Sequence, residues 1–255
     1  MTISPSKPPE GMDEELFAML KHLRLGRLLS HWDETLQTAR KGRYSAERLL
    51  KHVVEEEYRA KRENARLLRR QRANIPEMLE METFPFEKQP KLDRKRIMSL
   101  YDSFAYMTKQ RNMVWVGPTG CGKTGLATAF LLQAIDRGYR GYFITFPELL
   151  QELFQSLADR SEGKVLKRYL SYDCLVIDEV GYVEVEPAQV GQFFTLMHRR
   201  HKKKPTLITS NLGFSEWGSF LQNPHLTLAL IDRLTEKCDT TNMKDCESLR
   251  GKVAS

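Results

Sequence analysis

The clearest chemical signal in the sequence is a run of eight residues, Gly117-Pro118-Thr119-Gly120-Cys121-Gly122-Lys123-Thr124. The run matches the pattern G-x-x-x-x-G-K-[ST] in full, and it lies between a predicted strand and a predicted helix. Its glycines let backbone N–H groups curve around phosphate oxygens at the start of a helix. Lys123 would place a positive charge on the β- and γ-phosphates, and Thr124 a hydroxyl ligand on Mg²⁺. Cys121 fills a variable position. The run predicts a binding loop for a nucleoside triphosphate such as ATP.

Two acidic side chains, Asp178 and Glu179, follow a later apolar run over residues 174–177. The carboxyl ends of parallel strands are where open α/β sheets bind ligands. Asp178 is placed to orient Mg²⁺, and Glu179 is the candidate base for an attacking water. A site that only binds nucleotide has no clear need of the second carboxylate, so the pair favours ATP hydrolysis. Asn211, after another apolar run, either reaches the γ-phosphate or starts the next turn.

These side chains need a sheet to hold them, and the chain from residue 112 onward has the pattern of one. Short apolar runs alternate there with helical stretches, which predicts an α/β fold with a parallel sheet covered by helices on both faces. The expected strands are residues 113–117, 141–146, 174–178, 206–210 and, more weakly, 238–243. The expected helices are residues 123–137, 147–157, 187–200 and 215–222.

The first part of the chain is helical and basic. Apolar spacing predicts helices that begin near Asp13, that run from Leu28 to Gly42, and that run from Ser45 towards Arg72. Residues 21–72 hold 15 lysines and arginines against 7 aspartates and glutamates, a local net charge of +8, whereas the whole chain carries +7. Five arginines share one face of the third helix: Arg59, Arg62, Arg66, Arg69 and Arg70. That face is either a solvated helix surface or a ridge that contacts nucleic-acid phosphates.

Three prolines, Pro76, Pro85 and Pro90, interrupt helix formation and mark a linker. We therefore expect a small N-terminal all-α domain over residues 1–75 that binds DNA or a partner. A linker and a helix ending near Gln110 should follow over residues 76–110, and an ATPase domain should occupy residues 111–255.

Composition disfavours several other classes of protein. Hydrophobic residues make up 41% of the 255, enough for a core, yet no apolar run is long enough to span a membrane. The first residues lack the apolar stretch of a secretory signal. The four scattered cysteines form no C-x-x-C pair, which disfavours disulfides and zinc. His198 and His201 have metal-ligand spacing, but their flanking arginines and lysines favour a surface helix end or a DNA contact.

The three motifs, in this order, resemble those of the AAA+ ATPases. Within that class the sequence is similar to the ATP-binding helper proteins of bacterial insertion sequences, the IstB group, which are relatives of the DnaC-type helicase loaders. The resemblance covers nearly the whole chain and is most specific in residues 25–32, 177–182, 208–217 and 229–234. It implies a P-loop AAA+ core whose C-terminal lid is reduced or absent.

Residue by residue, the resemblance implies a Walker A loop at residues 117–124, Mg²⁺ and base at Asp178 and Glu179, and sensor 1 at Asn211. It makes Arg233 an arginine finger that acts on the ATP of a neighbouring subunit, which implies a homo-oligomer. Arg250 is the one late candidate for a sensor 2 arginine. The resemblance also places a helical insertion that faces DNA at residues 147–172. Its basic residues, which would contact the DNA backbone, are Arg160, Lys164, Lys167 and Arg168.

We therefore expect an ATP- and Mg²⁺-dependent oligomer that assembles on duplex DNA, largely without regard to sequence. It would hand that DNA to a DDE-type transposase encoded by the same element, in the bacterial cytoplasm with the nucleoid and away from membranes. Three alternatives stay open: a helicase loader acting on single-stranded DNA, a small-molecule kinase, and a nucleotide-gated scaffold without turnover. The N-terminal part has few aromatic residues for stacking bases, which argues mildly against the first.

Overall fold

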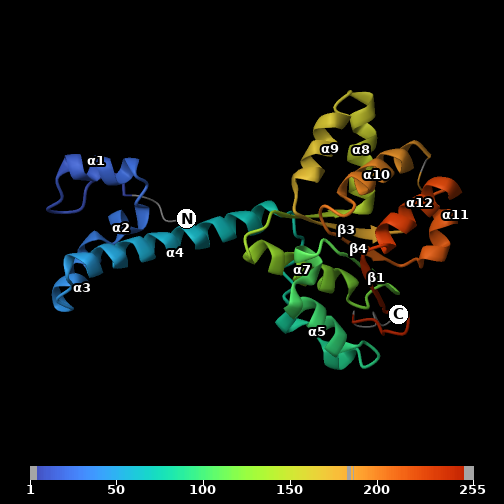
Figure 1. Ribbon diagram of the computed structural model, residues 1–255, viewed down its shortest axis with the longest axis horizontal. Helices are drawn as coiled ribbons and strands as arrows, with labels where there is room; N and C mark the ends of the chain where they lie inside the picture. The colour runs from blue at the N-terminus through green and yellow to red at the C-terminus, as the bar shows by residue number, and fades with distance from the viewer. Residues whose placement is uncertain (1–4, 183–184, 186, 250–255) are drawn as a thin grey trace, which may run out of the picture. The chain divides into compact units, whose positions relative to one another are not determined.

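The computed structural model of the chain describes residues 5–182, 185 and 187–249. Internal contacts divide the chain into two compact units, Met1–Leu68 and Arg69–Ser255. The first unit is entirely helical, and the second is built around a sheet (Figure 1). The expectation of an α/β core with a small all-α domain before it is confirmed.

The first unit contains short helices and most of one long helix. Asp13 caps the first of them by accepting a hydrogen bond from the Leu16 N–H at 3.0 Å. The expected helix from Leu28 to Gly42 is in fact two helices, because the backbone of His31 (φ −130°, ψ 32°) interrupts it. The helices are α1 (Glu14–His22), α2 (Gly26–Ser30), α3 (Trp32–Lys41) and α4 (Ala46–Arg72). Met12, Phe17, Leu20 and Leu29 form a small hydrophobic core that includes side chains of α1 and α2.

The last residues of α4 and the turn after it belong to the second unit. Arg70 forms an ion pair with Asp136. Ala73 is fully buried; its carbonyl accepts from the Phe143 N–H at 2.8 Å, and the Asn74 amide donates to the Phe143 carbonyl at 3.1 Å. These bonds cover the outer edge of a strand that would otherwise be open. The division between the units therefore falls before residue 69, whereas proline positions alone suggested residue 75.

The second unit is organised by a five-stranded parallel sheet in the order β2-β3-β4-β1-β5. All five expected strands are present, each within two residues of its expected bounds. They are β1 (Asn112–Val116), β2 (Gly141–Thr145), β3 (Cys174–Val180), β4 (Thr206–Ser210) and β5 (Cys238–Asn242).

One face of the sheet packs against α7 (Lys123–Asp136). Alternate residues such as Met113 and Trp115 belong to the core on this side, where the Trp115 ring packs against Phe130 of α7. Residues 76–110 also pack here, so this segment is part of the core and not a bare linker. The expected helix ending near Gln110 is split at Phe104, whose φ is 54°. The elements of residues 76–110 are η1 (Met81–Thr83), η2 (Phe86–Lys88), α5 (Arg94–Ser103) and α6 (Ala105–Thr108).

The opposite face of the sheet is covered by the remaining helices, as Figure 1 shows. Val114 and Val116 point to this side. The segment between β2 and β3 forms two helices, and a further helix follows Pro224 that periodicity alone had not delimited. The helices are α8 (Phe146–Ala158), α9 (Glu162–Ser171), α10 (Pro187–Arg200), η3 (Phe214–Glu216), α11 (Trp217–Phe220) and α12 (Pro224–Thr235). The prediction of a sheet covered on both faces is confirmed.

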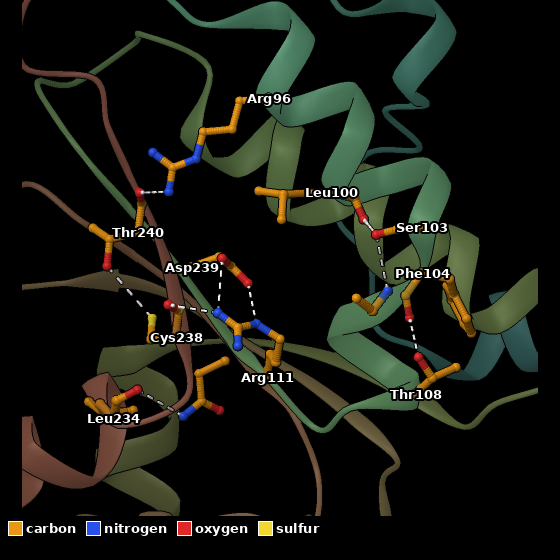
Figure 2. A network of polar contacts seen from close by, with 12 residues as sticks. Arg96, Leu100, Ser103, Phe104, Thr108, Arg111, Leu234, Cys238, Asp239 and Thr240 are labelled. Carbon is orange, nitrogen blue, oxygen red and sulfur yellow. Dashed lines mark hydrogen bonds and ion pairs between the residues drawn. The ribbon is translucent and has the colours of Figure 1, made fainter.

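The edge strand β5 is held by arginines from the segment before β1. Figure 2 shows the Arg111 guanidinium donating to both carboxylate oxygens of Asp239, at 2.6 and 3.1 Å, and Arg96 donating to the Thr240 carbonyl at 3.2 Å. Residues 243–249, the last that the structure describes, follow β5 without forming a helix.

Candidate nucleotide-binding site

The phosphate-binding loop connects β1 to α7 at the carboxyl edge of the sheet. Gly122, the residue just before α7, has a φ of 100°, which L side chains rarely adopt. A Cβ atom there would lie 2.8 Å from the Phe84 ring, so both conformation and space require glycine. The Lys123 ammonium is buried and donates to the carbonyls of Gly117 and Pro118 at 2.7 and 2.8 Å. The lysine is thus held inside the curve of the loop.

Asp178 lies at the end of β3, directly against the loop. The Thr124 hydroxyl donates to both of its carboxylate oxygens at 3.1 Å, and the Thr209 hydroxyl donates to it as well. Burial raises the pKa of Asp178, while the bonds from Thr209 and Thr124 oppose the shift. A hydroxyl beside a desolvated carboxylate is a donor set that suits Mg²⁺, which prefers oxygen ligands. These residues fit the expected metal.

Glu179 adopts a left-handed backbone with φ 62°, a conformation that costs a non-glycine residue on the order of 1 kcal/mol. Its N–H donates to the Thr209 hydroxyl at 3.0 Å. The pairing of β3 with β4 shifts register between Ile177 and Val180. In a regular strand neighbouring side chains point to opposite faces, but this irregularity lets Asp178 and Glu179 both line one cavity. One threonine, Thr209, therefore bonds both the carboxylate of Asp178 and the backbone of Glu179.

The cavity above the loop has a volume of about 820 Å³, a typical size for a small-molecule site. One wall consists of loop residues and strand ends. The other wall comes from residues that precede the sheet and combines the apolar Leu79, Phe84 and Pro85 with polar residues such as Glu77, Glu80 and Thr83. Sequence reasoning missed this wall, and no motif marks it. Thr209 was also missed, although its place at the end of a buried strand beside β3 was a usable signal.

Tyr182, just after β3, was missed as well. Its hydroxyl lies 3.1 Å from the Thr119 hydroxyl in the loop, and its ring is 40% exposed at the cavity. Asn211 is not among the residues that line the cavity. Its side-chain oxygen is buried, has no hydrogen-bond partner within the described residues, and packs against Gly181. The structure thus brings together the loop and the two acids but leaves Asn211 beside them.

Arg233 lies on α12 and does not line this cavity. Its Nε donates to His198 Nδ1 and its Nη1 to the Ala229 carbonyl, both at 2.9 Å. The guanidinium also lies 5.1 Å from the centre of the Phe194 ring. The side chain is therefore held in one orientation by α10 and by its own helix.

The basic candidates on α4 divide into two groups. Arg59 and Arg66 form ion pairs with Glu56 and Glu63 on the same helix, and Arg62 lies over the exposed ring of Tyr58. Arg69 and Arg70 instead belong to the second unit. Arg69 donates to the Ile135 carbonyl at 3.3 Å, and Arg70 bonds Asp136 and Glu80. Tertiary contacts thus distinguish arginines that periodicity places on one face.

The second basic group lies at α9 and the turn before it. Arg160, Lys164, Lys167 and Arg168 are all exposed, and Arg168 is also paired with Glu152 and lies over the Tyr169 ring. Arg250 falls outside the described residues.

The histidine pair at the end of α10 is occupied by protein contacts. His198 accepts from Arg233, and His201 bonds the Arg233 carbonyl and Glu236. Arg200 is buried and donates to backbone carbonyls and to Thr206, so this part of the basic run is structural. Among the described residues no group of three or more His, Cys, Asp or Glu could hold a metal ion. None of the helices described is long and apolar enough to cross a membrane.

Comparison with protein families gives a match over residues 18–255 to the model described as IstB-like ATP binding protein. The ATP-binding protein of insertion sequence IS21 from Pseudomonas aeruginosa is 30% identical, over 90% of this chain and 86% of its own length. The corresponding protein of IS5376 from Geobacillus stearothermophilus is 29% identical, over 91% and 92%.

Two solved structures share the fold of the second unit. DnaA from Aquifex aeolicus bound to AMPPCP superimposes with a TM-score of 0.56 at 17% identity, over 67% of this chain and 51% of that one. The DnaC helicase loader gives 0.51 at 24% identity, over 59% and 87%.

Proposed function

Because this chain belongs to the family of IstB-like ATP-binding proteins and has the AAA+ fold, we propose that it is an ATP-driven helper of DNA transposition. It assembles as an oligomer on duplex DNA and presents that DNA to a DDE-type transposase of the same element. ATP hydrolysis controls assembly and release. The observation that carries the proposal is the placement of Thr124, Asp178 and Glu179 around one cavity at the phosphate-binding loop.

The residues of the cavity have separate tasks in this proposal. Loop N–H groups and Lys123 hold the phosphates, while the apolar side chains of Leu79 and Phe84 receive the base. Mg²⁺, when bound at Thr124 and Asp178, neutralises charge on the phosphate oxygens. Glu179 accepts a proton from the attacking water, and its exposed position at the mouth of the cavity leaves room for that water.

Arg233 completes the site of a neighbouring subunit. Its absence from the cavity of its own chain and its fixed orientation against Phe194 and His198 both support this role. A cation held rigidly before reaction stabilises developing charge without having to reorganise. Hydrolysis then depends on assembly, so ATP turnover is coupled to the oligomer.

DNA contacts are assigned to arginines and lysines whose side chains are exposed or partly exposed. On α4 these are Arg59, Arg62 and Arg66, and at α9 they are Arg160, Lys164 and Lys167, with Arg168 at the edge of the group. Arg69 and Arg70 are engaged within the second unit, so the proposed contacts fall mainly on the others. Such contacts neutralise phosphates and position the protein without reading base sequence.

Measurement of particle size by light scattering tests the assembly proposal. The protein is compared with ATP, with ADP and without nucleotide, each with duplex DNA, with single-stranded DNA and with neither. We expect large assemblies only with ATP and duplex DNA. Monomers under every condition contradict the assembly role and the role of Arg233. Assembly on single strands in preference to duplex would instead favour a helicase-loader function.

A further inference from the structure

The outer side of the phosphate-binding loop is bonded to segments remote in the sequence. The Gly120 carbonyl accepts from the Leu249 N–H at 2.9 Å, and the Cys121 carbonyl accepts from the Gln89 side chain at 3.2 Å. In a loop that presents N–H groups to phosphate, the carbonyls beside those N–H groups point away from the phosphate, as those of Gly120 and Cys121 do. Donors on the outer side therefore favour the binding conformation.

Residues 243–249, which we call the strap, run along this outer side after β5. At one end the Met243 N–H donates to the Val116 carbonyl at 2.6 Å. A Cβ on Gly117 would lie 2.7 Å from the Met243 carbonyl oxygen, so loop and strap are in close contact there. At the other end the Leu249 side chain reaches Gly122 and lines the nucleotide cavity. The strap thus spans the loop from its first glycine to its last.

Gln89 fastens the strap to the loop. Its side chain is 1% exposed, and its amide nitrogen donates to the Cys121 carbonyl and, at 2.6 Å, to the Glu247 carbonyl. Its amide oxygen accepts from the Glu247 N–H at 3.1 Å. If the Gln89 amide were reversed, its oxygen would face two carbonyl oxygens. The hydrogen-bond partners therefore identify which atom is the nitrogen and which is the oxygen. Both hydrogens and one acceptor site are used, so the buried group is satisfied.

We propose that Gln89 is a positioning residue for nucleotide binding: it clamps the strap against the loop and so keeps the loop N–H groups directed at phosphate. Gln89 is not among the residues that line the cavity. Its effect is pre-organisation, because a loop already in the binding conformation loses less freedom when phosphate arrives. The inference rests on ATP binding at this loop and on no other part of the proposed function.

The first test compares two buried glutamines. Gln89→Leu removes the clamp, and the matched control Gln133→Leu removes an amide that also bonds a carbonyl and a hydroxyl, those of Tyr101 and Tyr106, at the far end of α7. We expect Gln89→Leu to weaken ATP and ADP binding on the order of tenfold by calorimetry. Gln133→Leu should lower Tm about as much as Gln89→Leu does. It should nevertheless change nucleotide affinity less than about twofold. Equal affinity losses in the two variants, or none in Gln89→Leu, overturn the proposal.

A second test leaves the buried core untouched, in case Gln89→Leu does not fold. Glu247 is exposed, so its side chain can be changed without disturbing the core. Glu247→Pro deletes the N–H that donates to the Gln89 amide oxygen, whereas Glu247→Ala keeps it. Weaker nucleotide binding in the proline variant alone supports the clamp, and equal binding in both refutes it. If the parent protein binds no ATP, the proposed nucleotide site itself is wrong. Normal binding by the parent and by Gln89→Leu would sink only the inference.

Discussion

The Thr124 hydroxyl donates to both carboxylate oxygens of Asp178 at 3.1 Å, across 54 residues of sequence. This contact joins the phosphate-binding loop to β3 and sets the Thr124 hydroxyl and the Asp178 carboxylate side by side. Asp178 is only 4% exposed, and burial raises its pKa. The site therefore keeps a desolvated negative charge, which costs folding stability.

Asp178→Asn should relieve this cost. The amide can still accept from Thr124 and Thr209 but carries no charge. We expect the free energy of unfolding, measured by urea denaturation at pH 7.5 with a chelator and without nucleotide, to rise by about 1 kcal/mol. Affinity for ATP in the presence of Mg²⁺ should fall in the same variant. A loss of stability together with a loss of binding would mean that Asp178 is chiefly a structural residue.

The stability gain in Asp178→Asn should depend on pH. The pKa of Asp178 is higher in the folded chain than in the unfolded chain. Folding then takes up a proton between the two values, so the cost of the buried charge is absent well below the unfolded pKa of about 3.9 and complete above the folded pKa. The difference between variant and parent should shrink as the pH falls from 7.5 towards 4. A constant difference over that range would falsify the assignment.

Glu179 combines backbone strain with the proposed role of base. Glu179→Gln should retain ATP binding and lose turnover by on the order of 10²-fold or more. Glu179→Gly should lose turnover equally, but glycine tolerates φ 62°, so its free energy of unfolding should rise by about 1 kcal/mol. Phosphate release and urea denaturation of both variants give the comparison. Turnover by either variant at the parental rate contradicts the role of Glu179.

Mixing of two inactive variants tests whether Arg233 acts between subunits. The Arg233→Ala variant retains an intact nucleotide cavity but lacks the proposed arginine finger. The Glu179→Gln variant retains Arg233 but lacks the proposed base. In mixed assemblies on duplex DNA the intact Arg233 can serve an intact cavity, so ATP turnover should reappear. Neither variant alone should exceed about 1% of parental turnover.

The control for the mixing experiment is Arg199→Ala, which removes an exposed arginine near the end of α10. It should retain parental turnover when tested alone. Activity that stays absent in mixtures, although both variants still assemble, would mean that Arg233 acts within its own chain or only holds α12 to α10.

Local patterns with a chemical meaning made much of the site predictable. Spacing and apolar runs predict the loop around Lys123, the acids at Asp178 and Glu179, and all five strands. These features are predictable because each is determined by residues that lie close together in the sequence. The breaks at His31 and Phe104 do not follow, since tertiary packing imposes a backbone that propensity does not indicate.

Contacts between distant segments were beyond the reach of the sequence. Gln89 bonds Glu247 across 158 residues, and Phe84 forms the wall of a cavity whose motif begins at Gly117. Neither residue belongs to a recurring pattern. Asn211 shows the opposite limit: the pattern finds its position at the end of β4, but the direction of its side chain depends on Gly181 and the turn around it.

The arginine stripe of α4 offers a last separation of roles, between Arg62 and Arg70. Arg62 faces solvent beside Tyr58, whereas Arg70 is bonded to Asp136 and Glu80. Arg62→Ala should weaken duplex DNA binding and reduce the slope of log affinity against log salt by about 0.9, the value for one phosphate contact. Arg70→Ala should leave that slope unchanged and lower the free energy of unfolding by about 1–3 kcal/mol, because it removes the charged hydrogen bonds that Arg70 donates to Asp136 and Glu80. Salt titrations of DNA binding and urea denaturation distinguish the two, and a reduced slope in Arg70→Ala alone would reverse the assignment.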